Sequence, residues 1–62
     1  MEYELKEIFT VEELMEYLNI GKNSAYALLE NGKIKAFRIG RIWKIPRKAV
    51  EDYIYSEVYN GK

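Results

Sequence analysis

The segment Ile34–Ile45 combines a hairpin pattern with a concentration of positive charge. Two short runs, about Ile34–Ile39 and Ile42–Ile45, are separated only by Gly40 and Arg41. A two-residue connection with glycine in the first place is typical of a type II′ turn, which joins antiparallel strands directly. The segment contains no acid, and its cations are Lys35, Arg38, Arg41 and Lys44, with Lys33 directly before it. The pattern predicts a basic β-hairpin.

Apolar side chains alternate with cations in both predicted strands. The alternating apolar residues are Phe37 and Ile39 in the first strand and Trp43 and Ile45 in the second. Because successive side chains of a strand point to opposite faces, we expect all four to pack on the rest of the chain and the cations to face outward. Such a hairpin is typical of a wing that touches a nucleic-acid backbone. Charged protection of a sheet edge is the alternative.

The charges of the chain are unevenly distributed along it. Ten cations and ten acids leave the 62 residues with no formal net charge. Residues 21–48 nevertheless carry eight Lys or Arg against one Glu, whereas residues 1–20 and 49–62 are net acidic. Screening acts over about 8 Å at physiological salt, so a local patch matters more than the total charge. The central block favours an anionic partner, with a dipolar, solvated surface as the alternative.

The composition excludes several kinds of chemistry. The chain has no Cys and no His, which removes disulfides, thiolate metal sites and the commonest general base. The carboxylates fall on predicted helix faces or in the N-terminal segment, and the glycines do not have the spacing of a phosphate loop. We therefore expect a protein that is not an enzyme and uses no cofactor and no metal.

Length and hydropathy predict one small domain, 1–62. No apolar run approaches the ~20 residues of a membrane span. The acidic N-terminus lacks the apolar centre of a signal peptide. We expect a soluble, cytoplasmic protein with no membrane association. Residues 1–8 are expected to form a loose arm or a short extended segment, and residues 56–62 a frayed tail.

A first helix is predicted to begin after Thr10. Thr10 and Glu13 have the spacing of a capping box, and Phe9 and Leu14 that of a hydrophobic staple. The apolar stripe of this helix is Val11, Leu14, Met15 and Leu18. The sequence therefore indicates an amphipathic helix with its apolar side toward the core.

Two further helices complete the expected fold. After a tight turn at 19–21, a second helix is predicted from Lys22 to Glu30, ended by Asn31-Gly32. Two short helices joined by such a turn form a helix-turn-helix pattern. Pro46 fits the first position of a third helix that fades near Tyr55–Tyr59. Its predicted inward residues are Val50, Tyr53 and Ile54. The expected fold is α+β, in the order α-α-β-β-α: a small winged helix-turn-helix with a two-stranded antiparallel wing.

Candidate contacts to DNA lie on the second helix and the wing. Lys22, Asn23 and Tyr26 occupy the outer side of the helix near its N-terminus, where a recognition helix meets base edges in the major groove. Asparagine can read adenine, and lysine binds guanine or phosphate. An ordinary exposed helix face is the alternative. Arg41, at the hairpin tip, is placed to enter a minor groove or follow the backbone.

Three cations lie at predicted helix N-termini, where the helix dipole disfavours positive charge. Lys22 begins the second helix, and Arg47 and Lys48 begin the third. Helix N-termini are themselves anion sites, so phosphates docking there would explain these cations. Glu51 and Asp52 are alternative partners for Arg47 and Lys48.

Several short motifs match the pattern of a known family. They are Thr10-Val11-Glu12-Glu13, Leu18-Asn19-Ile20, Ser24-Ala25-Tyr26, the segment 32–36 (Gly-Lys-Ile-Lys-Ala) and the segment 38–46 (Arg-Ile-Gly-Arg-Ile-Trp-Lys-Ile-Pro). On these motifs residues 10–54, about three quarters of the chain, resemble the excisionase-like, MerR-related winged helix-turn-helix domains. The motifs are specific for the domain family rather than for one biological role.

The resemblance implies a DNA-binding protein of a phage, plasmid or integrative element. Such proteins help a tyrosine recombinase excise the element, often bound side by side on double-stranded DNA, which would place this chain at the prokaryotic nucleoid. The positions carried over are Lys22, Asn23, Ser24, Tyr26 and Ala27 in the recognition helix and Arg38, Gly40, Arg41 and Lys44 in the wing. Ala27 and Glu30 depart from the family, which often has basic residues there, so weight shifts to Lys22, Asn23, Tyr26 and the wing.

Two other functions stay open on the sequence. One is a small transcriptional regulator of a phage or mobile element, which the same family also contains. The other is a protein-interaction winged helix, with the acidic first helix and the C-terminal tyrosines as its contact surface. A steep salt dependence of binding to duplex DNA would separate the DNA-binding hypotheses from the last one.

Overall fold

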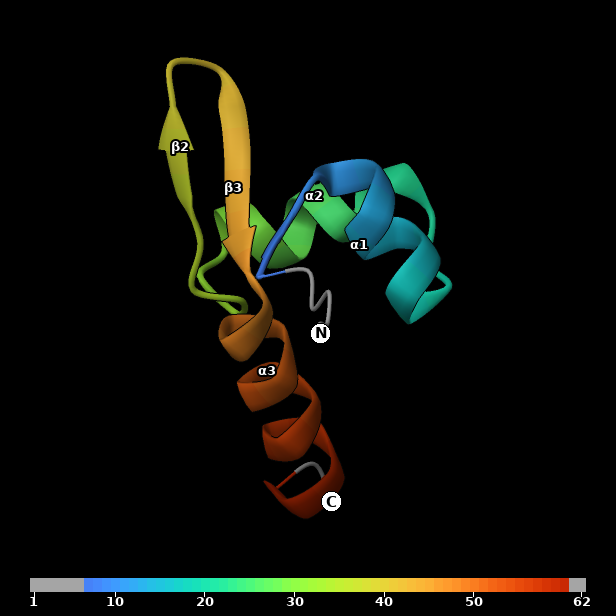
Figure 1. The fold of residues 1–62 in the computed structure, drawn as a ribbon. Helices are drawn as coiled ribbons and strands as arrows, with labels where there is room; N and C mark the ends of the chain where they lie inside the picture. The colour runs from blue at the N-terminus through green and yellow to red at the C-terminus, as the bar shows by residue number, and fades with distance from the viewer. Residues whose placement is uncertain (1–6, 61–62) are drawn as a thin grey trace, which may run out of the picture.

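The computed structural model describes residues 7–60 and shows three helices and a three-stranded antiparallel sheet (Figure 1). In chain order the elements are β1 (Ile8–Phe9), α1 (Val11–Leu18), α2 (Lys22–Glu30), β2 (Phe37–Ile39), β3 (Ile42–Pro46) and α3 (Arg47–Asn60). The strands β2 and β3 form a hairpin that rises from the body, and α3 projects the opposite way (Figure 1). The predicted α+β winged helix-turn-helix is confirmed.

Helix α1 begins with the predicted capping box. The backbone N–H of Glu13 donates to the Thr10 hydroxyl at 3.1 Å, and the Thr10 N–H donates to the Glu13 carboxylate at 2.9 Å. The helix ends at Asn19, whose φ of 58° places it in the left-handed region that asparagine tolerates. This tight ending turns the chain into α2 within three residues.

Helix α2 ends in a Schellman motif, which aims the chain at the hairpin. Gly32 has a φ of +76°, a conformation that glycine adopts without steric cost. Its N–H donates to the carbonyl of Leu29 at 3.2 Å, and the Lys33 N–H donates to the carbonyl of Leu28 at 3.0 Å. Ile34 follows and is fully buried. The predicted first strand therefore shortens to Phe37–Ile39, and before it Ile34 and Ala36 pack on the core instead of pairing with β3.

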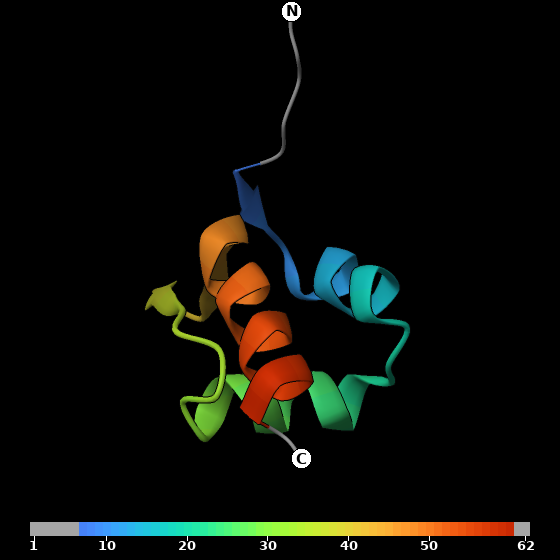
Figure 2. The same ribbon diagram turned by 90° about the horizontal axis from the view of Figure 1, so that it is seen from below.

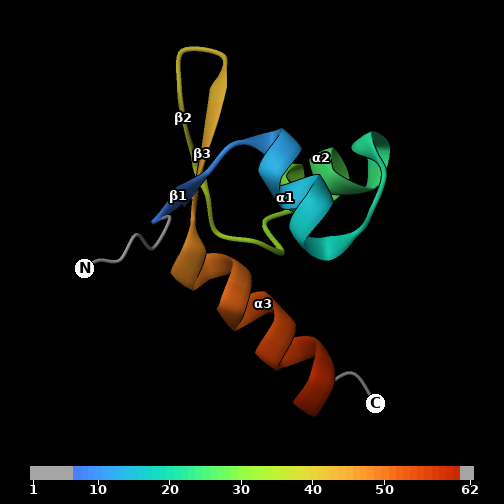
Figure 3. The ribbon, with the colours of Figure 1, turned by 45° about the vertical axis from the view of Figure 1, so that its right-hand side comes forward.

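A third strand, which the sequence did not predict, completes the sheet. β1 pairs with the base of β3 in the register Ile8↔Pro46 and Phe9↔Ile45, giving the strand order β1-β3-β2. Figure 3 shows β1 crossing beside β3 below the free part of the hairpin. Residue 8 was expected in a loose arm or a short extended segment, and strand pairing fixes it; the rest of that arm, residues 1–6, lies outside the described residues.

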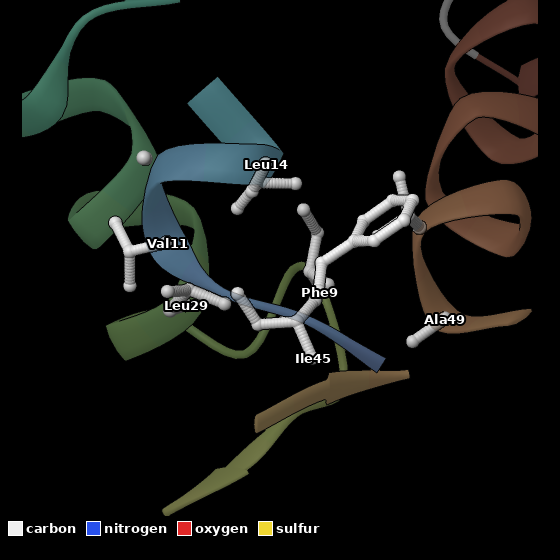
Figure 4. Close-up of a cluster of buried hydrophobic side chains, with 9 residues drawn as sticks. Phe9, Val11, Leu14, Leu29, Ile45 and Ala49 are labelled. Carbon is white, nitrogen blue, oxygen red and sulfur yellow. The ribbon is translucent and has the colours of Figure 1, made fainter. Parts of the chain in front are cut away.

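The hydrophobic core lies where the helices meet the base of the hairpin. The fully buried large side chains are Leu14, Ile34, Ile45 and Val50, from α1, the segment before β2, β3 and α3. Phe9 and Leu14, the predicted staple pair, both belong to this cluster (Figure 4). Every buried side chain of the described residues is apolar. The core therefore anchors the wing at its base and leaves its tip free.

Strand register corrects the predicted faces of the wing. The partners are Phe37↔Lys44, Arg38↔Trp43 and Ile39↔Ile42. Directly opposed residues of an antiparallel pair share one face. One face of the wing therefore carries Arg38, Trp43 and Ile45, and the other carries Phe37, Ile39, Ile42 and Lys44. The expectation of one apolar and one basic face was wrong, because a two-residue turn pairs odd-numbered positions of β2 with even-numbered positions of β3.

Helix α3 differs from the prediction at both ends. Pro46 is the last residue of β3 rather than the first of the helix, and the Arg47 N–H donates to the Glu7 carbonyl at 2.8 Å. The helix continues to Asn60, just beyond the range Tyr55–Tyr59 in which it was expected to fade, so the expected frayed tail is helical up to that residue. Figure 2 views the chain from below, nearly along the direction in which α3 projects. The contacts of α3 with the sheet are to β3. Its predicted inward residues are confirmed: Val50 is buried, and Tyr53 and Ile54 pack against the core.

Candidate nucleic-acid interface

The outer side of α2 presents the residues predicted for a recognition helix. Lys22, Asn23, Ser24 and Ala27 are exposed, whereas Tyr26 is half-buried and packs against the core. Gly21 is the N-cap residue of α2 and has no side chain that could accept a hydrogen bond. The first backbone N–H groups of α2 therefore have no side-chain acceptor from the cap. This leaves donors and the Lys22 ammonium together at one helix end, an arrangement that suits an anion.

The free part of the wing holds its cations in different ways. The Arg38 guanidinium lies over the Trp43 ring, 5.0 Å from its centroid, which is cation–π geometry. Gly40 has a φ of +64° while Arg41 keeps a negative φ, in agreement with the predicted type II′ turn. Arg41 is exposed at the tip, and Lys44 is half-buried on the opposite face from Arg38. The Trp43 indole therefore orients the Arg38 guanidinium, and the turn places Arg41 at the exposed tip.

The structure brings the two predicted contact elements together around one hollow. This hollow has a volume of about 230 Å³ and lies between the start of α1, the middle of α2 and the outer end of β3. Its lining residues are Thr10, Val11, Glu12, Tyr26, Arg41, Ile42 and Trp43. Tyr26 of the recognition helix and Arg41 of the wing thus border the same concave surface. A ligand seated there would touch both elements at once.

Arg47 and Lys48 do not line this hollow, and each forms an ion pair with an acid of its own helix. The Arg47 guanidinium binds the Glu51 carboxylate and the Lys48 ammonium binds the Asp52 carboxylate, each at 3.0 Å and one helical turn apart. The hydrogen bond and charge of Asp52 raise the pKa of Lys48 above its ordinary value. These local partners explain why the two cations tolerate a helix N-terminus, so their contact with phosphate stays a prediction.

Sequence reasoning missed two surfaces. Phe37 and Ile39 were assigned to the core side, yet they are 49% and 61% exposed, and Ile42, which had no assignment, is 61% exposed. The parity of the two-residue turn was the signal that could have placed them. Lys33 and Lys35 were counted only as charge; together with Lys48 they border a hollow of about 460 Å³ beside α3.

Among residues 7–60, no helix is both long enough and apolar enough to cross a membrane. The same residues contain no group of three or more Asp or Glu side chains placed to hold a metal ion.

Comparison with known proteins identifies the fold family. Residues 8–57 match the family described as Helix-turn-helix domain. A protein of Saccharopolyspora erythraea named "Probable excisionase" is 46% identical over 46 residues, which are 74% of this chain and 47% of that protein. Proteins from two strains of Mycobacterium tuberculosis, assigned DNA binding by name, are each 30% identical over 55 residues, 89% of this chain and 70% of theirs.

The chain spans about half the length of the excisionase and about 70% of the mycobacterial proteins. No solved structure matches it. The family match covers both helices of the pair, the wing and most of α3, and the excisionase shares nearly half of the aligned residues. The chain therefore belongs to an excisionase-like helix-turn-helix domain family.

Proposed function

We propose that the chain binds double-stranded DNA, with α2 in the major groove and the wing along the adjacent minor groove. The observation that carries this proposal is the shared hollow, which sets Tyr26 of α2 and Arg41 of the wing on one concave surface. The names of the mycobacterial relatives, which assign them DNA binding, support the same partner. Phosphate contacts supply affinity and register, and base contacts supply sequence choice.

Each candidate residue has a distinct role in this arrangement. Lys22 and Arg41 are exposed cations that neutralise phosphates, and Lys44 adds charge on the outer face of the wing. Asn23, exposed on the first turn of α2, reads adenine through its amide. Tyr26 is half-buried, so its ring is held by the core while its hydroxyl is available to a phosphate. Ser24 and Ala27 line the same helix side without charge.

We further propose that this binding serves excision of a mobile element, as a recombination directionality factor that helps a tyrosine recombinase. The name of the Saccharopolyspora relative and the motifs of residues 10–54 support this role. Side-by-side binding on the attachment-site DNA would be part of it. Recombinase reactions with and without the protein test the role: more excision of a paired-site substrate supports it, and an unchanged yield refutes it.

DNA binding itself is tested by a gel-shift salt series on duplexes that the protein selects from a random-sequence pool. Several phosphate contacts should make log K fall with log salt at a slope of about −0.9 per contact. Asn23→Ala should change the selected sequence while leaving the slope unchanged, because an amide releases no counterion. Asn31→Ala, the same change at the exposed C-terminal end of α2, is the matched control. A flat salt response, or no selected sequence, would refute the proposal.

One observation favours a protein-binding function as a second candidate. Tyr55, Val58 and Tyr59 are 64%, 66% and 69% exposed on the projecting end of α3, and the two tyrosine rings lie 4.5 Å apart. They form an apolar stripe at helical spacing outside the core. A recombinase bound there would combine both functions. Loss of recombinase binding in a Tyr55→Ser variant that still binds DNA would support this surface.

A further inference from the structure

The outer face of the wing is an apolar surface that the fold does not use. It consists of Phe37, Ile39 and Ile42, which strand register places on the face opposite Trp43 and Ile45; Ile42, next to the turn, also borders the hollow beside Arg41. Their exposed fractions are 49%, 61% and 61%, and none of the three belongs to the core or packs against it. Exposed apolar patches with polar surroundings mark interaction sites.

Folding alone gives little reason for this choice of residues. Threonine would supply the same β-branched preference for a strand without exposing apolar surface. Edge strands also avoid exposed apolar side chains, because these invite pairing with another chain. Ile39 and Ile42 are direct cross-strand partners and form the last pair before the turn, so they are the paired residues closest to the tip of the wing.

We propose that this outer face is an apolar wedge that opens the minor groove of double-stranded DNA. The inference rests on the proposed DNA-binding function and adds a mechanism to it. Charge complementarity selects the partner: Arg41 lies in the turn between the two isoleucines, Lys44 lies opposite Phe37, and no acid occurs between Lys33 and Pro46. An apolar strip with cations at its turn and on its face, and with no acid in the hairpin itself, suits a surface with phosphates at its rims and sugars and base edges between them.

The width of the minor groove, compared with that of the hairpin, explains why a wedge is needed. The minor groove of regular duplex DNA is about 6 Å wide. Paired strands alone lie about 4.7–4.9 Å apart, before any side chain is counted. The tip can therefore enter only a widened groove. Apolar side chains pressed against a base step unstack it in part and kink the duplex away from the protein, which widens the groove. The Ile39–Ile42 pair performs this step, and Arg41 holds a phosphate at the rim.

The test uses a duplex selected by the protein from a random pool, with 2-aminopurine placed at successive positions. Unstacking should raise the fluorescence at one base step when the wild-type protein binds. The double variant Ile39→Thr/Ile42→Thr keeps β-branching but loses apolar contact. Its fluorescence rise should disappear and its affinity should fall about tenfold, with the salt slope unchanged because no cation is removed.

Matched variants separate the wedge from general effects. Ile8→Thr makes the same substitution in strand β1, at a side chain that is 40% exposed and has no proposed binding role, and should leave affinity and fluorescence unchanged. Ile39→Val/Ile42→Val keeps an apolar tip and should retain most of the fluorescence rise. Circular dichroism verifies the fold, and the single threonine variants replace the double variant if it does not fold.

The outcomes distinguish this inference from the proposed function. If the wild-type protein binds duplex with a steep salt slope but no labelled step brightens, the wedge is refuted and DNA binding stands. The same holds if the threonine variants bind and brighten like wild type, or if they lose only self-association in sedimentation or binding to anionic lipid vesicles. If the wild-type protein does not bind duplex at all, both proposals fail.

Discussion

Replacing Thr10 with alanine is expected to destabilise the fold by about 1 kcal/mol, within a range of roughly 0.5–2 kcal/mol for such caps. The hydroxyl of Thr10 accepts from the Glu13 N–H at 3.1 Å, and alanine leaves that donor without its cap. Helix α1 has only eight residues and carries Val11 and Leu14 into the core, so a weakened first turn loosens core packing as well.

The measurement is thermal and urea unfolding followed by circular dichroism. For a domain of this size, 1 kcal/mol shifts the midpoint by about 4–8 °C. Thr10→Ser should restore the wild-type midpoint, because serine supplies the same acceptor. Thr10→Gly should lose only a few tenths of a kcal/mol, since glycine is itself a favourable cap.

A double-mutant cycle with Glu13→Ala tests whether the two hydrogen bonds act together. In a capping box each side chain positions the other, so the two single losses should sum to more than the loss in the double variant. The explanation would be refuted if Thr10→Ala melts like wild type, or if Thr10→Gly is less stable than Thr10→Ala. Additive losses would show two independent hydrogen bonds instead of one motif.

Four further changes test other parts of the structure. Leu14→Ala, at a fully buried position, should cost about 2–5 kcal/mol and leave little cooperative unfolding in urea. Gly40→Ala should cost about 1–2 kcal/mol, because Gly40 has a φ of +64°, and Gly40→Asn should cost less in the same melt. Arg41→Gln should reduce the salt slope of duplex binding by about one, and an unchanged slope would remove Arg41 from the phosphate contacts. The Lys48–Asp52 pair raises the pKa of Lys48 above its ordinary value of 10.5. The pair therefore stabilises the folded state below that pH, and this contribution is lost as the pH rises through the folded-state pKa. Lys48→Met should reduce the dependence of the free energy of unfolding on alkaline pH, measured by urea unfolding at a series of pH values.

The helix-turn-helix could be predicted from sequence because its signals are local. Thr10 and Glu13 cap α1 three residues apart, and Gly32 closes α2 by its own backbone freedom. The stripe that includes Leu14 requires only the helical period. These features depend on neighbours in the chain, so no knowledge of the tertiary fold is needed to place them.

The features that sequence reasoning missed are of two kinds. β1 consists of two residues, and it exists because Phe9 reaches Ile45, thirty-six positions along the chain. The faces of the wing, in contrast, depend on a local signal, because the two-residue turn sets which residue of β2 opposes which residue of β3. The candidate site divides in the same way: exposure of Asn23 was predictable from the helix period, whereas the meeting of Tyr26 with Arg41 required the fold.

The position of the core explains why the wing tip is available for function. Ile34, Ile45 and Val50 bury their side chains at the base of the hairpin, and Phe9 closes the same region from β1. Beyond Trp43, the hairpin is held by backbone pairing, the Gly40 turn and the contact between Arg38 and Trp43. Substitutions at Ile39 or Ile42 therefore change little that the core needs. Because the core does not determine these two positions, the proposed wedge can be tested at Ile39 and Ile42 without disturbing the packing that holds the base of the hairpin.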